Sequence, residues 1–347
     1  MDEEILVLRI KRSLFEWSSF LPLKSMIETF IKQQKEKNDE SIYEQTLWEF
    51  QSKISNETLN SVLFRLYPPC PKSTTAFIKK LLLVFENNQV EGNNSFYEYV
   101  TNSENIHEQE VQFFKSYFDE CGSHLVSLIE TNELICNGTT GLRTWQAGKF
   151  LYEWILKNLH YFPKNEEYSI LELGSGVGYT GLCIFNDERC AVRHITLTDH
   201  HPSVLNALHQ NVEANLCSIK KKSVDERTIV FPKKFTASDG KSERTVIIDS
   251  LDWENFGFKE SDPDNYLCDI VIGADIVFDV SVIPYLLNVI VKFLRNLGTQ
   301  KVILANCLRN EKTDEFFANE LTNRNLTVKK ETHMVDDNLP LNLYVIE

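Results

Sequence analysis

The feature that most constrains the fold of this chain is the stretch SILELGSGVGYTGL at residues 169–182. An apolar run ends at Leu173, and four glycines follow within eight positions, starting at Gly174. This order predicts a strand, a tight turn and a helix, because such a turn lets backbone N–H groups approach a nucleotide cofactor. The glycines fit two frames: Glu172-x-Gly174-x-Gly176-x-Gly178 suits S-adenosylmethionine, and Gly176-x-Gly178-x-x-Gly181 suits a dinucleotide.

Downstream of this turn, strand-like and helix-like segments alternate. Such repeated β–α units predict a mostly parallel sheet with helices on both faces. Two final strands without a helix between them predict one antiparallel edge. We expect strands at Tyr168–Leu173, His194–Asp199, Thr245–Asp249, Asp269–Ala274 and Lys301–Asn306, with the final pair near 326–331 and 342–346. We expect helices at about 178–186, 202–215, 281–295 and 311–323.

The glycines alone do not decide between the two cofactors, but three further features favour S-adenosylmethionine. The first strand stops at Leu173, so Gly174 is the natural first glycine of the turn. Glu172 is placed to hold the positively charged amino-acid end of that cofactor through hydrogen bonds. The two closing strands fit a seven-stranded, Rossmann-like class I methyltransferase sheet. We therefore expect an α/β fold of that class, with S-adenosyl-L-methionine as cofactor.

Ligands of open α/β sheets bind outside the carboxyl ends of the strands, so the residues there are the candidates. Asp199 ends the second strand and is expected to accept hydrogen bonds from ribose hydroxyls. Trp253 follows the third strand and is expected near the adenine, because an indole face stacks well on a flat heterocycle. Asp252 has two interpretations, a hydrogen bond to the adenine amino group or a helix cap.

The segment GADIVFD at residues 273–279 is the candidate acceptor site. Asp275 ends the fourth strand, where its carboxylate would face the methyl group and orient an amine by hydrogen bonds. Phe278 would form a wall against the lysine stem. A lysine amine, with an ordinary pKa of about 10.4, must lose a proton before it can accept a methyl group. Taken alone, the segment equally fits a buried strand that ends in a capping aspartate.

Residues 1 to about 87 show apolar residues at helical spacing and no catalytic constellation. An Asn-rich stretch at about 87–105 predicts a polar loop, followed by a short helix at 108–119. Residues 125–145 predict two short strands around a Gly-Thr-Thr-Gly turn. We therefore predict a helical N-terminal domain at 1–124, for substrate docking or stabilisation, and a methyltransferase domain at 125–347. The charged stretch 217–244 has no functional interpretation.

The net charge and the cysteine pattern limit the classes of partner that we expect for this chain. The 347 residues carry a net charge of −14, without the basic face that nucleic-acid binding requires. No segment approaches the roughly 20 apolar residues of a membrane span. The eight cysteines are scattered without a Cys-x-x-Cys pair, which favours a reducing compartment and no metal site. We expect a cytoplasmic monomer that acts on a protein or a small molecule, and not on nucleic acid or a membrane.

Several motifs together resemble one known family, the seven-β-strand (family 16) protein-lysine methyltransferases. They are LELGSGVGYTG, the Leu-Asp-Trp after the third strand, and GADIVFD, which fits that family's Asp-x-x-Tyr/Phe motif. GTTGLRTWQAGKFLYEW at residues 138–154 and the helical extension with YPPCP resemble the eukaryotic elongation factor 2 lysine methyltransferase branch.

The resemblance implies elongation factor 2 as the protein substrate, with Asp275 and Phe278 handling the acceptor lysine. It also implies cofactor contacts from Trp145, Gly174, Ser175, Gly176, Asp199, Trp253 and Ala274. Phe278 stands where many members have tyrosine, so a hydroxyl is lost. Three other functions stay open: methylation of another protein or a small molecule, a chaperone-like binding module, and a nicotinamide oxidoreductase.

Overall fold

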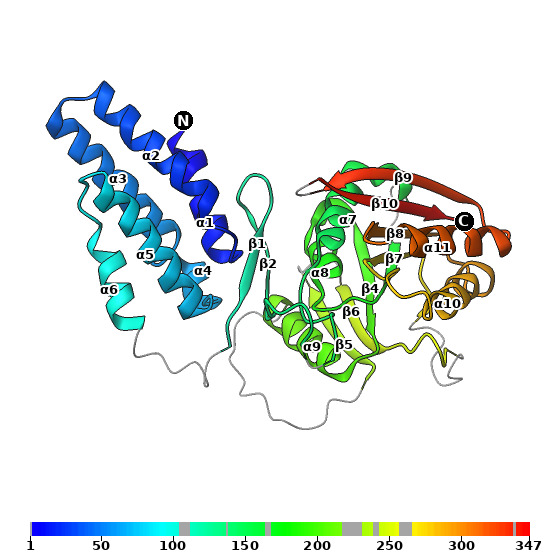
Figure 1. The fold of residues 1–347 in the computed structure, drawn as a ribbon. Coiled ribbons are helices and arrows are strands. Elements are labelled where there is room, and N and C mark those ends of the chain that lie inside the picture. The colour runs from blue at the N-terminus through cyan, green and yellow to red at the C-terminus, as the bar shows by residue number, and fades with distance from the viewer. Residues whose placement is uncertain are drawn as a thin grey trace. The chain divides into compact units, whose positions relative to one another are not determined.

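The structure is a computed structural model that describes residues 2–103, 112–136, 138–163, 168–216, 231–238, 243–256, 266–335 and 338–347. The chain forms two compact units, Met1–Ile129 and Glu130–Glu347 (Figure 1). The boundary expected between residues 124 and 125 would cut strand β2, His124–Leu128, near its start; the observed division lies just after that strand, between Ile129 and Glu130. In the part of the chain described, no helix is both long enough and apolar enough to cross a membrane.

The first unit is helical, as its periodicity predicts. Its core is largely aromatic: the rings of Phe30 and Phe50 lie 4.5 Å apart, and those of Phe50 and Phe85 lie 6.4 Å apart. Pro71 occupies the first turn of its helix, where a missing N–H costs nothing. The helices are α1 (Glu3–Phe15), α2 (Leu21–Lys37), α3 (Glu40–Glu57), α4 (Val62–Leu66), α5 (Pro71–Asn87) and α6 (Asn94–Ser103).

Helix α6 corrects the prediction of a polar loop at about 87–105. Phe96 is fully buried, and Tyr99 and Val100 pack on the same core at helical spacing. The side-chain oxygen of Asn93 accepts the N–H of Ser95 at 3.0 Å. The Asn-rich composition that indicated a loop therefore supplies the start of a helix, and three apolar residues decide the structure.

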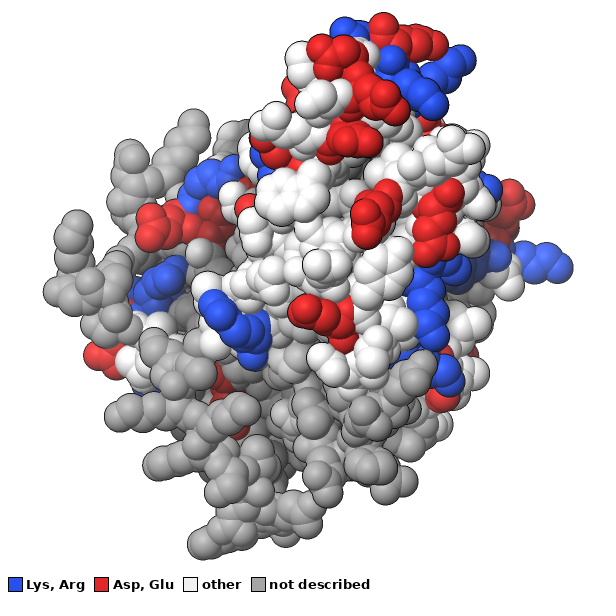
Figure 2. Space-filling model, turned by 90° about the vertical axis from the view of Figure 1, so that its left-hand side faces the viewer, with Lys and Arg blue, Asp and Glu red and all other residues white. Residues whose placement is uncertain are grey.

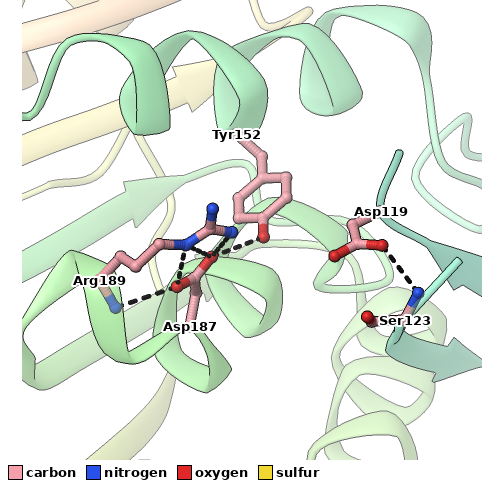
Figure 3. Close-up of polar contacts among 5 residues, drawn as sticks. All are labelled: Asp119, Ser123, Tyr152, Asp187 and Arg189. Atoms are coloured by element: carbon pink, nitrogen blue, oxygen red, sulfur yellow. Dashed lines mark hydrogen bonds and ion pairs between the residues drawn. The ribbon is translucent and has the colours of Figure 1, made fainter. Parts of the chain in front are cut away.

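The prediction of a short helix at 108–119 is also wrong in the part of that range that the structure describes. Strand β1 (Lys115–Phe118) pairs antiparallel with β2. The turn between them is closed by Asp119, whose Oδ1 accepts the N–H of Ser123 at 2.7 Å (Figure 3). Of the two strands expected within 125–145, β2 accounts for the first; the second is reduced to a single bridge between Cys136 and Thr139.

The second unit is built on one sheet of eight strands in the described residues, in the order β5-β6-β4-β3-β7-β8-β10-β9. The five strands from β6 to β8 are parallel, and β10 runs antiparallel to β8. This confirms the predicted α/β class with its antiparallel edge. The strands are β3 (Tyr168–Leu173), β4 (Val192–Asp199), β5 (Lys233–Ser238), β6 (Glu243–Ser250), β7 (Ile270–Ala274), β8 (Lys301–Cys307), β9 (Val328–Val335) and β10 (Leu339–Ile346).

Strand β5 is the addition to the seven strands expected. It pairs antiparallel with β6 and comes from the charged stretch 217–244, of which residues 217–230 and 239–242 lie outside the described residues. Figure 1 shows α7 and α8 on one side of the sheet, and α10 and α11 on the other. The helices are α7 (Gln146–Lys157), α8 (Tyr179–Asn186), α9 (Pro202–Leu216), α10 (Ile283–Asn296) and α11 (Glu311–Asn323), with short 3₁₀ turns at Leu159–Tyr161 and Glu188–Cys190.

Candidate functional site

A cavity of about 620 Å³ lies at the carboxyl ends of β3, β4 and β7. This is the edge at which ligands of parallel α/β sheets bind. All ten residues that the sequence singled out line this cavity: Trp145, Glu172, Gly174, Ser175, Gly176, Asp199, Trp253, Ala274, Asp275 and Phe278. The structure thus brings the predicted residues together, while the role of each remains a proposal.

The turn after β3 needs glycine at the first two of the three glycine positions of the S-adenosylmethionine frame. Gly174 and Gly176 have φ of +62° and +55°, a conformation that costs other residues about 1–2 kcal/mol. A Cβ on Gly176 would lie 3.0 Å from the carbonyl oxygen of Gly141, and one on Gly174 would lie 2.7 Å from Cγ2 of Ile276. The glycines therefore allow the backbone to approach its neighbours closely and leave the cavity floor free of side chains.

Asp199 ties the turn to the end of the neighbouring strand. Its Oδ2 accepts the N–H of Gly176 at 3.1 Å, and its Oδ1 accepts the N–H groups of His200 at 2.8 Å and His201 at 3.1 Å. Burial raises the pKa of Asp199, against the effect of these three N–H groups. Because a carboxylate has about four acceptor positions, these three bonds leave one on Oδ2 for the donor of a ligand.

Glu172 is the most deeply buried acid of the cavity, with 2 % of its surface exposed. Burial raises its pKa to about 7. Among the described residues, its Oε2 has no hydrogen-bond partner. This oxygen would lie 2.7 Å from a Cβ on Gly181 and so faces α8; it is the buried acid in the cavity lining that favours a cationic ligand group such as the amino end of S-adenosylmethionine.

The charge of the lining fits the same cofactor. Five carboxylates and one guanidinium line the cavity, contributed by Glu172, Asp199, Asp252, Glu254, Asp275 and Arg143. An acidic pocket attracts the sulfonium and ammonium charges of S-adenosylmethionine and repels the pyrophosphate of a dinucleotide. The open glycine turn, the buried acid Glu172 and the negative charge of the cavity lining therefore all fit S-adenosylmethionine.

Asp275 follows β7 directly and adopts φ of +55°, rare for a residue other than glycine. Its N–H donates to the carbonyl of Ala305 at 2.8 Å, and its Oδ1 accepts the N–H of Cys307 at 2.8 Å. Arg309 donates to both carboxylate oxygens, at 3.1 Å and 3.0 Å. The side chain, 4 % exposed, is therefore fixed at the cavity wall by three hydrogen bonds, and the backbone N–H of Asp275 adds a fourth bond to β8.

Phe278 lies farther out, and 58 % of its surface is exposed. The segment before it is fixed by the N–H of Val277, which donates to Oδ1 of Asn306 at 3.0 Å. Tyr285 on α10 lines the same cavity and is partly exposed. An exposed aromatic ring at the mouth suits an extended aliphatic stem, and Tyr285 supplies a phenol hydroxyl that Phe278 lacks.

The two tryptophans differ in their surroundings. Trp145 caps α7, donates from Nε1 to the carbonyl of Thr140 at 3.0 Å, and lies under the guanidinium groups of Arg143 and Arg309, 4.8 Å and 4.9 Å from the ring centre. Trp253 packs against the core below the sheet edge and comes within reach of Gly174. Both indoles line the cavity, and that of Trp253 lies beside the glycine turn.

Asp252 caps a turn of its own loop and also lines the cavity; in the described residues no helix begins there, so the helix-cap interpretation is not supported. Its Oδ1 accepts the N–H of Glu254 at 3.0 Å, and its Oδ2 accepts a hydrogen from the Asn255 amide at 2.8 Å. Side-chain hydrogen bonding from Asn255 lowers the pKa of Asp252. The carboxylate is thus held by its own loop.

A cluster behind the cavity fixes α7, the helix that carries Trp145 at its start. Asp187 accepts the Tyr152 hydroxyl at 2.9 Å and is bound by Arg189 at 2.6 Å (Figure 3). Burial alone would raise the pKa of Asp187, but hydrogen bonds from Arg189 and Tyr152 outweigh it and lower the pKa. The cluster joins α7 to the turn that follows α8.

Sequence reasoning missed several residues of the site. Thr139 and Thr140 come from the Gly-Thr-Thr-Gly turn and Arg143 follows it; the segment contributed to the family resemblance, but these three residues were not predicted as part of the site. The close approach of Gly141 to Gly176 brings this segment over the glycine turn. Arg309, from the segment after β8, carried no motif, so only the folded structure reveals its contact with Asp275.

The sheet order, the glycine turn and the acidic strand ends define a class I methyltransferase. The sequence profile of the lysine methyltransferase family matches residues 127–235 and 225–323. The chain belongs to this family, and its cofactor is S-adenosylmethionine, as the residues of the turn predict.

Two groups of curated relatives are similar to the chain. The protein-lysine N-methyltransferase EEF2KMT of Mus musculus is 31 % identical over 257 residues, covering 73 % of this chain and 69 % of that protein. EEF2KMT of Homo sapiens is 29 % identical over 271 residues, covering 77 % of this chain and 75 % of that protein. The protein-lysine N-methyltransferase EFM3 of Saccharomyces cerevisiae is 25 % identical over 205 residues, covering 56 % of this chain and 52 % of that protein.

Proposed function

We propose that this protein transfers a methyl group from S-adenosylmethionine to the ε-amine of a lysine in elongation factor 2, in the cytoplasm. The observation that carries the lysine acceptor is Asp275, a fixed carboxylate at the wall of the cofactor cavity, with the exposed ring of Phe278 three residues on. The similarity to EEF2KMT supports the choice of protein substrate.

In this mechanism the cofactor supplies a methyl group on a positively charged sulfur, open to in-line attack by a nitrogen lone pair. The residues of the chain hold the acceptor lysine in position for this attack. Phe278 packs against the lysine stem, and Asp275 accepts a hydrogen bond from the amine. The proton of the incoming ammonium group leaves to water at the open mouth. Alignment of this kind provides most of the acceleration in such displacements, and a misplacement of 1 Å can cost about a hundredfold in rate.

The test compares methyl transfer to purified elongation factor 2 by the wild type and by Asp275→Asn. Asparagine tolerates a positive φ, whereas alanine would add backbone strain to the loss of the carboxylate. We expect the rate to fall about a hundredfold, with S-adenosylmethionine affinity retained. Asp279→Asn is the matched control, because Asp279 is exposed and only bonds Ser281 in its own loop.

The outcomes separate the proposal from its alternatives. Transfer to other cellular proteins and not to elongation factor 2 would keep the lysine acceptor and replace the substrate. Transfer to a protein-free extract would indicate a small-molecule acceptor. Binding of S-adenosylmethionine without any transfer would indicate a binding module. Equal rates for the wild type and Asp275→Asn would contradict the acceptor assignment.

A further inference from the structure

Arg309 contacts two of the predicted site residues, Asp275 and Trp145. The sequence predicted it neither as a residue of the acceptor site nor as a residue of the cofactor site. Its Nη1 and Nη2 donate to Oδ1 and Oδ2 of Asp275 at 3.1 Å and 3.0 Å, a paired geometry that only a planar guanidinium provides. Its Cζ lies 4.9 Å from the ring centre of Trp145. Arg309 therefore links the expected acceptor carboxylate to an indole of the cavity.

These contacts leave Asp275 one acceptor position. Oδ1 already accepts from Arg309 and from the N–H of Cys307, and Oδ2 accepts from Arg309. A carboxylate offers about four positions, so one remains on Oδ2. The ion pair also cancels the charge of the carboxylate, because Arg309 stays protonated at every accessible pH.

The pairing of Asp275 with Arg309 removes a conflict between holding the acceptor amine and keeping it neutral. A lone carboxylate beside a lysine stabilises the ammonium form, which has no lone pair and cannot accept a methyl group. A neutral ion pair still accepts a hydrogen bond but no longer favours the ammonium form. We propose that Arg309 is a positioning residue that pairs with Asp275, so that the carboxylate orients a neutral acceptor amine without holding it protonated. This inference rests on the proposed function.

Other titratable groups face the same cavity, and the test must separate them from Arg309. They are Arg143, Glu172, Asp199, His200, Asp252 and Glu254, with the phenols of Tyr179 and Tyr285. The thiol of Cys307 also lies beside Asp275, but burial raises its pKa to about 12. A substitution at Arg309 leaves all of these groups in place; because the charge of Arg309 lowers the pKa of Cys307, its loss moves that pKa further up and keeps the thiol outside the pH range measured.

The experiment measures kcat for methyl transfer to elongation factor 2 from about pH 7 to about pH 10, with both substrates saturating. Removing one opposing charge shifts a neighbouring pKa by about one unit or more. For Arg309→Gln we expect the pH midpoint to rise by about one unit and kcat near pH 7 to fall about tenfold, with recovery at alkaline pH. Arg309→Lys keeps the charge and is expected to keep the wild-type midpoint, even if its rate falls.

Arg324→Gln is the matched control, since Arg324 pairs with Glu320 on α11 and is expected to leave kcat and the midpoint unchanged. A wild-type midpoint in Arg309→Gln, or an alkaline shift in Arg309→Lys, would overturn the inference while the proposed function stands. A faster Arg309→Gln near pH 7 would overturn it too, because Arg309 would then compete with the acceptor amine. Absence of transfer by the wild type overturns the proposed function and the inference together.

Discussion

At the scale of single residues, Glu172 lines the cofactor cavity and opposes the stability of the ligand-free protein. Its carboxyl group is almost fully buried, and burial raises its pKa to about 7. Between the ordinary value of 4.5 and about 7, the folded protein therefore holds a proton that the unfolded chain has lost. In the ligand-free protein this group accordingly opposes folding increasingly from about pH 4.5 to about pH 7 and fully above that, and it ceases to do so as the pH falls below about 4.5. A bound cationic ligand has the opposite effect, because it stabilises the ionised carboxylate of Glu172.

The affinity for S-adenosylmethionine should therefore depend on the protonation of Glu172. As the pH falls below about 7, binding must expel a proton, and the affinity should fall by up to about tenfold per pH unit. Titration calorimetry across this range should show the decline for the wild type. Glu172→Gln should bind more weakly at pH 8 and lose the decline. Glu254→Gln, which alters an exposed acid of the same cavity, should retain it. A decline of equal size in Glu172→Gln would contradict the assignment.

The sequence predicted these cavity residues because strand ends can be located from apolar runs. Leu173 was placed correctly as the end of a strand, which made Glu172 and Gly174 candidates at once. Arg309 could not be predicted in the same way. Its partner lies 34 positions away, and the contact depends on the register of β7 against β8 and on the positive φ of Asp275.

At the scale of elements, the strands with strong apolar runs were predicted, and the elements that depend on tertiary contacts were not. Strand β1 exists because β2 pairs with it, and α6 because Phe96 reaches the core of the first unit. Strand β5 forms on the edge of β6 from a stretch rich in charged residues. In each case the tertiary contact that stabilises the element cannot be recognised from the local composition. Propensity alone therefore predicted a loop or a helix at these positions.

The contact between α7 and the turn after α8 gives a prediction at this scale. Tyr152 is buried and donates its hydroxyl to Asp187, whereas the buried hydroxyl of Tyr168 has no partner among the described residues. Tyr152→Phe should lower the free energy of unfolding by about 1–2 kcal/mol, because it removes a hydrogen bond to a charged group. Tyr168→Phe removes a similar hydroxyl and should leave stability unchanged or slightly raised. Denaturant unfolding of both variants measures the difference, and equal losses would contradict the role of the cluster.

At the scale of the whole molecule, the second unit accounts for the cofactor site, and the role of the first unit is a proposal. The face in Figure 2 shows carboxylates among uncharged side chains, with lysines and arginines in small groups. In the first unit, a cavity of about 820 Å³ near the ends of α2 and α5 and the start of α3 is lined by the indole of Trp48, by one base, Lys35, and by three acids, Glu40, Glu44 and Glu91. Of the Trp48 surface, 62 % is exposed. Acids around an exposed indole suit a lysine-bearing protein surface, so we propose that this cavity docks elongation factor 2.

Trp48→Ala tests this docking role without touching the cofactor site. Aromatic side chains at the centre of an interface are often worth about 1–2 kcal/mol, so KM for elongation factor 2 should rise about tenfold. The value of kcat and the affinity for S-adenosylmethionine should stay unchanged, because both depend on residues of the second unit. Leu21→Ala is the matched control: Leu21 is 77 % exposed at the opposite end of α2. If both variants keep the wild-type KM, the first unit does not dock the substrate through this cavity, and its aromatic core then points to a stabilising role.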